Sequence, residues 1–262
     1  MSRHLTPAVA LSLAALAAAP AALAQAYPSK PITIVVGYPA GGSTDLTGRT
    51  LADALTKQLG VPVVIENLGG AGGAIGAQKV AHAAPDGYTL LVGANNEVAI
   101  SKLVTKTTKY DLKDFTPIGL IASQPMVLVA SPSAGVKNID EFVAKVKAAP
   151  GKYSYGSSGV GTALHLAGEM VKERAGLFMT HIPYRGVAPL TTDLVGGNLE
   201  YGVFVLSSGL PHIKSGKVVA LGTTEARRSP STPDIPALGA HKALKGIDIG
   251  SWFVLMGPAR LP

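Results

Sequence analysis

The sequence has no cysteine and few aromatic side chains, and each shortage excludes a class of function. Without cysteine the chain has no disulfide framework, no thiol ligand for a metal and no cysteine for a lipid anchor. Aromatic residues make up 5% of the chain, and the 23 Lys and Arg residues are scattered along it. Nucleic-acid surfaces instead cluster basic residues, often with aromatic side chains among them. We therefore expect no nucleic-acid partner.

Catalytic and metal-binding motifs are also scarce. The six histidines form no His-Glu-x-x-His pair, so no metal site is predicted. Gly151-Lys152 is followed by Tyr153 instead of Ser or Thr, which excludes the usual phosphate loop. The 16 acidic residues lie mostly in predicted helices and leave no persuasive acid and base pair. We therefore expect no metal, no cofactor and no enzymatic activity.

The first 26 residues have the layout of a cleaved export signal. Arg3 and His4 precede an Ala/Leu run over residues 8–19, and the small-x-small sites Ala22-Leu23-Ala24 and Ala24-Gln25-Ala26 follow. The apolar run is too short to span a bilayer. We expect residues 1–26 to be a signal peptide and the mature chain to lie outside the cytoplasm.

Residues 32–45 predict a strand, a tight loop and a helix in succession. Ile32-Thr33-Ile34-Val35-Val36 favours a strand, Gly37-Tyr38-Pro39-Ala40-Gly41-Gly42 is a turn, and Ser43-Thr44-Asp45 opens an apolar-periodic segment. Such a corner presents backbone N–H groups and the positive end of a helix dipole, which favour an anion such as a carboxylate. An ordinary strand-to-helix turn is the alternative, and these residues alone do not decide between the two.

A second glycine-rich stretch, residues 67–76, suggests dinucleotide binding but does not match its pattern. Counting Gly-x-Gly-x-x-Gly from Gly70 places Ile75 where the third glycine belongs. No acidic residue ends a strand about twenty residues later. A flexible loop that opens a helix over residues 74–84 is the better interpretation.

Asparagines stand at the end of the next strand and at the start of the clearest helix. Residues 88–92 predict a buried strand that leads to Asn95 and Asn96, which either contact a ligand or cap a short helix. Asn138 caps the clearest helix, with Glu141 three residues on. One apolar face identifies this helix as scaffold: Ile139, Phe142, Val143 and Val146.

The strand, loop and helix pattern repeats in the second half of the chain. Residues 152–155 are strand-like, Gly156-Ser157-Ser158-Gly159-Val160-Gly161 is a Gly/Ser loop, and Thr162 caps a helix that ends near Ala175. Two lobes that each aim a helix N-terminus at a shared cleft would clamp a negatively charged ligand. The hydroxyls of Ser157, Ser158 and Thr162 add donors beyond what a turn needs.

A secreted α/β hydrolase is the alternative from another functional class. In it Ser157 or Ser158 would be the nucleophile and His165, one turn inside the following helix, the base. The Gly-x-Ser-x-Gly elbow is not met, because Val160 stands at the fifth place counted from Gly156. A third interpretation, the sensing half of a regulator, lacks a DNA-binding helix pair in this sequence.

Alternating strands and helices predict an α/β fold of two lobes, with mostly parallel sheets flanked by helices and a central cleft. Pro125 separates two apolar runs and marks the first crossing between the lobes. The Pro/Ser-rich loop 223–236 is the expected return crossing. Lobe 1 then comprises residues 27–122 and 223–262, and lobe 2 residues 123–222.

Six segments spread over the mature chain share the pattern of one family. They are Gly37-Tyr38-Pro39-Ala40-Gly41-Gly42-Ser43-Thr44-Asp45, Glu66-Asn67, Pro85-Asp86-Gly87-Tyr88-Thr89-Leu90, Tyr155-Gly156-Ser157-Ser158-Gly159 with Thr162 and His165-Leu166-Ala167-Gly168-Glu169, His181-Ile182-Pro183-Tyr184-Arg185-Gly186, and Leu210-Pro211-His212-Ile213-Lys214-Ser215-Gly216-Lys217. The chain resembles the Bug-type solute receptors of tripartite tricarboxylate transporters.

That resemblance implies a periplasmic binding protein of the two-lobed type II fold. It implies that a ligand carboxylate is held between the loop Tyr38 to Thr44 and the loop Ser157 to Thr162, and that the membrane subunits of a transporter are the partners. A monomer is expected. Family chains continue past the position of Pro262 with helices that pack on the first lobe, so we expect those helices to be missing here.

One departure from the family pattern concerns the ligand. The family usually carries Asp-Asn where this chain has Val205 and Leu206, which favours a carboxylate with an apolar or aromatic body. The expected ligand is a di- or tricarboxylate, or an aromatic carboxylate. Arg185 is either a solvent-exposed cation or the partner of a second ligand carboxylate. The expected ligand-binding residues are Tyr38, Ala40, Gly41, Gly42, Ser43, Thr44, Asn95, Ser157, Ser158, Gly159, Thr162, His165, Arg185 and Leu206.

Overall fold

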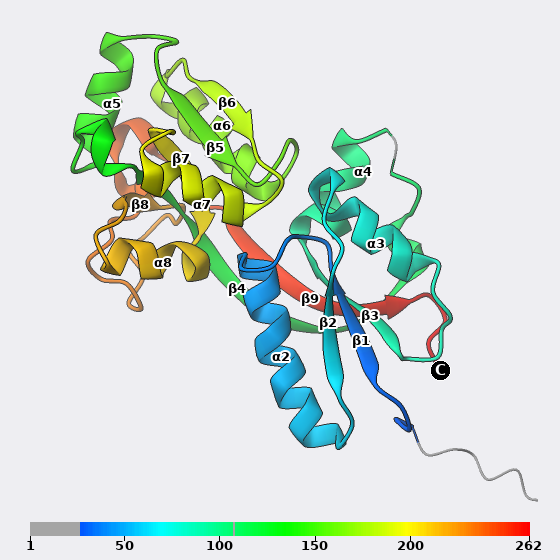
Figure 1. Ribbon diagram of the computed structural model, residues 1–262. Coiled ribbons are helices and arrows are strands. Elements are labelled where there is room, and N and C mark those ends of the chain that lie inside the picture. Colours follow the sequence, from blue (N-terminus) through cyan, green and yellow to red (C-terminus); the bar gives the residue numbers. More distant parts are fainter. Residues whose placement is uncertain (1–26, 107) are drawn as a thin grey trace, which may run out of the picture.

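The computed structural model describes residues 27–106 and 108–262, and the expected signal peptide lies outside the described residues. Within them, the strands form one mixed sheet that runs through two lobes (Figure 1). Its strand order is β2-β1-β3-β9-β4-β7-β5-β6, and β8 pairs with β4 beside this path. The predicted α/β class and two-lobed architecture are confirmed.

The first lobe contains three parallel strands and one antiparallel strand. Val36 pairs with Asn67 on one side, and with Val92 on the other. The carboxyl ends of the three parallel strands therefore meet at one edge, where open α/β sheets bind ligands. The bounds of the four strands are β1 (Ile32–Val36), β2 (Val63–Asn67), β3 (Thr89–Ala94) and β9 (Gly250–Pro258).

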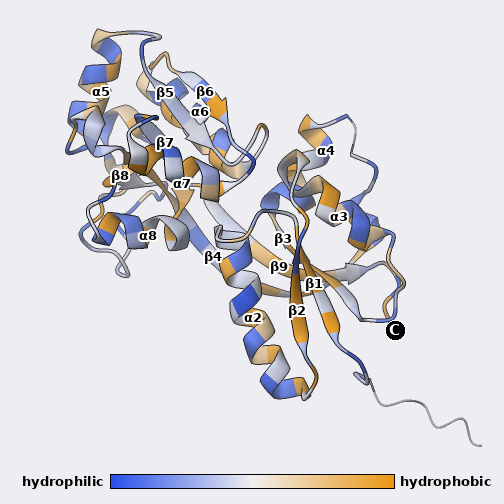
Figure 2. Cartoon of the chain, viewed as in Figure 1, coloured by the Kyte–Doolittle hydropathy of each residue, from blue (hydrophilic) through white to orange (hydrophobic). Residues whose placement is uncertain are grey.

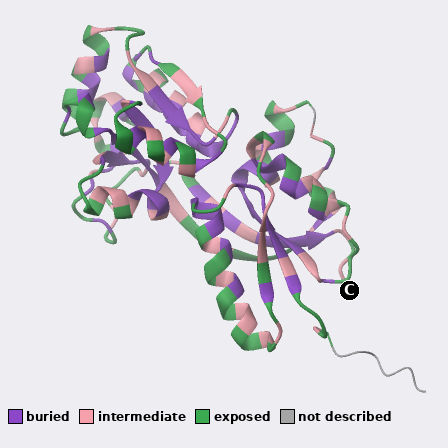
Figure 3. Cartoon of the chain, viewed as in Figure 1, coloured by how far each residue is buried: buried purple, intermediate pink, exposed green. Residues whose placement is uncertain are grey.

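Helices pack on both faces of this part of the sheet. Ala52 in the first helix belongs to one apolar cluster, and Ala77 and Val80 in the second belong to another. The central strands β1 and β3 are mostly apolar and buried, whereas the outer face of the first helix is polar and exposed (Figures 2 and 3). The helices are α2 (Ser43–Leu59), α3 (Ala74–Ala81) and α4 (Ser101–Val104).

The second lobe repeats this arrangement around its own parallel strands. Ser157 pairs with Pro183, and Tyr155 with Tyr201, so three more strand ends lie together. The strands are β5 (Ser154–Ser157), β6 (Thr180–Pro183), β7 (Tyr201–Val205) and β8 (Val219–Thr223). The helices are α5 (Ile139–Ala148), α6 (Ala163–Ala175), α7 (Val187–Gly196) and α8 (Leu206–Lys214).

Short helical turns complete the connections. Their bounds are η1 (Ala71–Gly73), η2 (Asn96–Ile100), η3 (Leu112–Asp114), η4 (Pro132–Ala134), η5 (Leu238–Ala240) and η6 (Lys242–Leu244). In the part of the chain that the structure describes, no helix combines the length and the hydropathy that a membrane span requires.

A single long strand, β4 (Phe115–Ala130), joins the two lobes. Its first half pairs with β9 as far as Pro125 opposite Gly250, and its second half pairs with β7 from Met126 onward. The two apolar runs on either side of Pro125 are therefore one strand, which changes partner at the proline. The four strand pairs made by β4 and β9 are antiparallel, and the four among the remaining strands are parallel.

The segment after β8 is placed differently from the expected boundary at residue 223. Ile235, Leu238, Leu244 and Ile247 are buried in the large apolar cluster of the second lobe. The chain reaches the first lobe again only with β9, which begins at Gly250. The physical reason is that these four apolar side chains complete the second core, which a Pro/Ser-rich composition does not reveal. The other proposed boundaries remain predictions.

Candidate functional site

The loop between β1 and α2 brings bare backbone N–H groups to the edge of the first lobe. Gly41 has φ of +86°, a conformation that glycine adopts without strain, and Gly42 is the N-cap of α2. No side chain among the described residues caps α2 at Gly42. The N–H groups at Ser43 and Thr44 have no intrahelical partners at this end, so they are available to an anionic acceptor.

Hydrogen bonds to the Asp45 carboxylate fix the shape of this loop. Its carboxylate accepts hydrogen bonds from Gly41 N at 2.9 Å, Arg49 Nε at 3.0 Å and Asn67 Nδ2 at 2.9 Å. Burial alone would raise the pKa of Asp45, but these hydrogen bonds lower it below its usual value. The Gly41 amide is therefore already used within the loop, and the charge of Asp45 is compensated there.

The corner between β5 and α6 lies opposite in the second lobe. Thr162 is the N-cap of α6, and its hydroxyl accepts from His165 N at 3.3 Å. Ser158 Oγ donates to Thr162 Oγ1 at 3.2 Å, which holds the Ser158 side chain beside the helix N-terminus. Both corners therefore present a helix start together with hydroxyl groups.

A pair of hydrogen-bonded side chains, Tyr38 and Asn96, links the first lobe to α6. Tyr38 Oη donates to Gly72 O at 2.7 Å and accepts from Asn96 Nδ2. The other end of the Asn96 amide, Oδ1, accepts from Ala163 N at 2.6 Å. Burial raises the pKa of Tyr38 well above its usual value, so its hydroxyl stays protonated and can donate.

Between the two helix starts lies the central pocket. At this lobe separation about 20 Å³ of it is accessible to the centre of a water molecule. No Asp or Glu is among the residues that line it. The lining consists of Tyr38, Gly42, Ser43, Thr44, Ala94, Asn96, Ser158, Ala163, Leu164, Val187, Val205, Ser251 and Phe253.

A wider side pocket of about 290 Å³ shares Tyr38 and Ser158 with the central pocket. Arg185 lines this side pocket and is exposed there. Its other walls come from the loop before α3, the residue after α4, the β5–α6 loop, and the end of β6 with the residue after it. They are Gly70, Ala71, Gly72, Gly73, Thr105, Gly159, Val160, Pro183 and Tyr184.

The structure divides the expected ligand-binding residues into three groups. Those that line the central pocket are Tyr38, Gly42, Ser43, Thr44 and Ser158. Those that line only the side pocket are Gly159 and Arg185. Those that line neither are Ala40, Gly41, Asn95, Ser157, Thr162, His165 and Leu206. Asn95 instead donates to Gly250 O at 3.3 Å.

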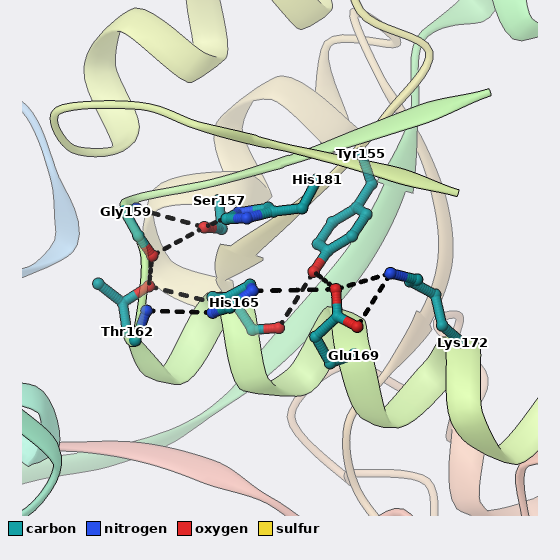
Figure 4. Close-up of polar contacts among 9 residues, drawn as sticks. Tyr155, Ser157, Gly159, Thr162, His165, Glu169, Lys172 and His181 are labelled. Carbon is teal, nitrogen blue, oxygen red and sulfur yellow. Dashed lines mark hydrogen bonds and ion pairs between the residues drawn. The ribbon is translucent and has the colours of Figure 1, made fainter. Parts of the chain in front are cut away.

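Ser157 and His165 belong to a hydrogen-bonded cluster behind the β5–α6 loop (Figure 4). Ser157 is fully buried, contacts His181 Nε2 at 2.8 Å and donates to Gly159 O at 3.1 Å. His165 Nδ1 accepts from Gly161 N at 3.0 Å, and its ring stacks on His181 with centroids 4.0 Å apart. These side chains support the loop from the protein side.

Burial is the main cause that lowers the pKa of both histidines, against the opposing charge of Glu169. Burial and the neighbouring His165 lower the pKa of His181 to about 4. The Glu169 carboxylate accepts from Tyr155 Oη at 2.6 Å and from Lys172 Nζ at 2.8 Å (Figure 4). The buried Ser157 pairs with His181 instead of His165, so the expected pairing of a hydrolase is not formed. The described residues also contain no group of acidic, His or Cys side chains that would hold a metal.

Several pocket residues were absent from the expected set. Asn96 is the chief example, because the expectation fell on Asn95 at the same strand end. Asn95 has helical backbone angles and Asn96 begins η2, so the two side chains point in different directions, and the sequence does not say which one faces the cleft. Phe253 and Ser251 come from β9, whose position beside β3 depends on long-range pairing.

Comparison with known proteins decides the family. The family model described as the tripartite tricarboxylate transporter family receptor matches residues 47–262. The chain belongs to this receptor family. BugT of Bordetella pertussis is 35% identical over 237 residues, which cover 90% of this chain and 72% of BugT. The resemblance to Bug-type receptors is thereby confirmed.

Two solved structures of similar proteins have ligands in their descriptions. Rpa4515 of R. palustris, described with adipate, is 32% identical in sequence to this chain. The match covers 90% of this chain and 79% of the Rpa4515 chain, with a TM-score of 0.88. MatC of Rhodopseudomonas palustris, described with bound malate, is 30% identical in sequence to this chain. The match covers 90% of this chain and 80% of the MatC chain, with a TM-score of 0.83. This receptor therefore has the fold of solute-binding proteins, and its family is not an enzyme family.

Proposed function

We propose that this receptor closes its two lobes around a small organic carboxylate and delivers it to the membrane subunits of a tripartite tricarboxylate transporter. One observation carries the proposal: α2 and α6 begin at the same central pocket, which is lined by hydroxyl groups and by no acidic side chain. Helix N-termini and hydroxyl donors stabilise a carboxylate, whereas a cation would find no counter-charge among these lining residues.

Among small organic carboxylates, a dicarboxylate with an apolar body fits this site best. Val187, Val205 and Phe253 supply an apolar wall in the central pocket. Arg185 lies in the adjoining side pocket, where a second carboxylate would reach it. The ligands named for the two solved relatives, adipate and malate, are both dicarboxylates. The same site would take a tricarboxylate whose third group points into the side pocket.

The expected affinity follows from the number of donors. Hydrogen bonds to a charged group contribute about 1.5–3 kcal/mol each. Three or four of them, less the free energy needed to order the lobes, suit a Kd of about 1 μM, which corresponds to about 8 kcal/mol. The receptor would act as a monomer in the periplasm, release its ligand unchanged and catalyse no reaction. The hydrolase alternative has no support from the site, because Ser157 is buried with His181 and Ser158 bonds to Thr162.

A thermal-shift screen tests this proposal. Purified protein is heated with monocarboxylates, dicarboxylates, tricarboxylates, amino acids and neutral sugars, each at about 100 times the expected Kd. Binding at that ratio stabilises a protein by about 2.7 kcal/mol, so the melting temperature should rise by a few degrees with at least one dicarboxylate or tricarboxylate. A rise with sugars or amino acids and none with any carboxylate would refute the assignment.

A further inference from the structure

Asn96 makes a direct hydrogen-bonded connection between the two lobes. Its side chain leaves the end of β3 in the first lobe and is only 8% exposed. Nδ2 donates to Tyr38 Oη, and Oδ1 accepts from Ala163 N at 2.6 Å. Ala163 is the first residue of α6, so the amide oxygen of Asn96 occupies a helix start that belongs to the other lobe.

The surroundings of Asn96 show that the lobes touch on both sides of this connection. A methyl group added at Gly186, before α7, would come within 2.9 Å of Pro39 Cδ in the β1–α2 loop. On the other side, a methyl group at Gly72 would lie 3.6 Å from Thr162 Cγ2. Backbone and side chains thus meet across the cleft, and only about 20 Å³ of the central pocket between them is accessible to the centre of a water molecule.

The hydrogen bond to Asn96 uses a donor that a bound carboxylate would need. The N–H of Ala163 is a group that an anion at the start of α6 would use, and Asn96 Oδ1 already accepts from it. A ligand oxygen can therefore accept from this N–H only if the hydrogen bond to Asn96 breaks.

We propose that Asn96 is a latch residue: its side chain holds the lobes together by taking the place of a ligand oxygen at the N-terminus of α6. In the absence of ligand the latch populates the closed arrangement. A carboxylate then competes with Asn96 for the Ala163 N–H, so Asn96 sets the affinity of the receptor. The closed arrangement of the lobes is inferred from the contacts of Asn96 alone. The competition between Asn96 and a carboxylate rests on the proposed function.

The latch is tested first without any ligand, because the cysteine-free chain allows two labels to be placed cleanly. Lys57→Cys in α2 and Lys147→Cys in α5 put nitroxide labels on exposed positions of the two lobes. Pulsed electron–electron double resonance then measures the label-to-label distances. Wild type should show one major population, and Asn96→Ala should lose most of it to a different, broader set of distances.

Asn198→Ala is the matched control, because Asn198 is exposed in the second lobe and follows α7. Its distance distribution should coincide with that of wild type. If Asn96→Ala also gives the wild-type distribution, Asn96 does not hold the lobes and the latch is refuted, whatever the ligand proves to be.

Asn96→Asp separates the latch from its competition with ligand, and it covers the case in which Asn96→Ala folds poorly. A carboxylate at position 96 still accepts from Ala163 N, and Tyr38 Oη can donate to it, so the closed distances should persist. The same fixed charge repels an anionic ligand, so the Kd for adipate should rise about tenfold or more. Wild-type affinity in Asn96→Asp would overturn the proposed competition.

Asn96→Ala should have the opposite effect on adipate binding. Removal of the latch raises the fraction of receptor that is open to ligand, and the apparent Kd falls in inverse proportion to that fraction. A decrease of about threefold or more is expected in titration calorimetry. An unchanged or larger Kd, together with altered label distances, would show that the latch exists but does not compete with the ligand. A complete lack of adipate binding in all variants would refute the proposed function and leave the ligand-free result standing.

Discussion

Glu97 is a carboxyl group buried beneath the cleft loop of the first lobe. The residue is 2% exposed, Oε2 accepts from Ala94 N at 3.1 Å, and Oε1 has no hydrogen-bond partner among the described residues. Burial raises its pKa from 4.5 to about 8, against the smaller opposing effect of its backbone hydrogen bonds. At neutral pH the side chain is therefore mostly protonated, and the first lobe has no uncompensated negative charge near Tyr38.

The raised pKa of Glu97 predicts a pH-dependent stability. Between pH 4.5 and about 8 the folded state holds a proton on Glu97 that the unfolded state has lost. The contribution of protonated Glu97 to the free energy of unfolding is therefore complete below pH 4.5. It decreases as the pH rises toward 8, by up to about 1.4 kcal/mol per pH unit. Glu97→Gln should flatten this decrease in urea unfolding curves recorded from pH 5 to pH 9. Glu173→Gln, an exposed change, should keep it; equal slopes in both variants would contradict the burial argument.

Arg185 provides the residue-level test of ligand class. Under the proposed function Arg185→Ala removes the partner of the second carboxylate and should weaken a dicarboxylate by about 2 kcal/mol, roughly thirtyfold. A monocarboxylate should be almost unaffected, since it has no group in the side pocket. Arg227→Ala is a suitable control, because Arg227 is exposed and lines neither pocket. Equal losses for both ligands in calorimetry, or no loss for either, would remove Arg185 from the site.

At the scale of elements, close packing of α6 on β5 positions the second-lobe corner. A methyl group at Gly168 would overlap the ring of Tyr155, so α6 lies directly on this side chain. Tyr155 Oη in turn donates to Glu169 Oε1 at 2.6 Å, one residue further along the helix. The start of α6 is thereby held at the pocket by contacts on the opposite side of the helix.

Gly168→Ala should consequently destabilise the fold by overpacking. Extra methyl groups in a well-packed core cost about 1–3 kcal/mol, which would lower the melting temperature by several degrees. Gly119→Ala is the comparison, because Gly119 is exposed in β4 and an added methyl group there meets open space. That variant should change the unfolding free energy by about 0.5 kcal/mol or less. If Gly168→Ala and Gly119→Ala have the same melting temperature, close packing of α6 on Tyr155 does not fix the position of this helix.

The elements that the sequence predicted well are those fixed by local chemistry. Asn138 caps α5 with a hydrogen bond from Glu141 N at 2.9 Å, and the predicted apolar face is buried. The two strand, loop and helix corners also begin where their glycines and hydroxyl residues indicated. By contrast, β4 continues through Pro125, because its pairing with β9 and then β7 depends on residues far away in the sequence.

At the scale of the whole molecule, function depends on how the two lobes face each other. The family pattern identified the receptor class and both cleft loops, but the approach of Asn96 to Ala163 joins residues 67 positions apart. Neither composition nor periodicity encodes that contact. The same limit explains residues 235–247, whose buried apolar side chains belong to the second lobe although the loop composition suggested a crossing.

Titration calorimetry of adipate shows whether a carboxylate binds where α2 and α6 begin. Wild type should bind one equivalent with a Kd of about 1 μM. Ser158→Ala should weaken binding about tenfold or more, because one hydrogen bond to a charged group contributes about 1.5–3 kcal/mol. Ser133→Ala, an exposed change elsewhere in the second lobe, should bind like wild type. Identical affinities of the Ser158→Ala and Ser133→Ala variants would place the carboxylate outside the central pocket and contradict the account.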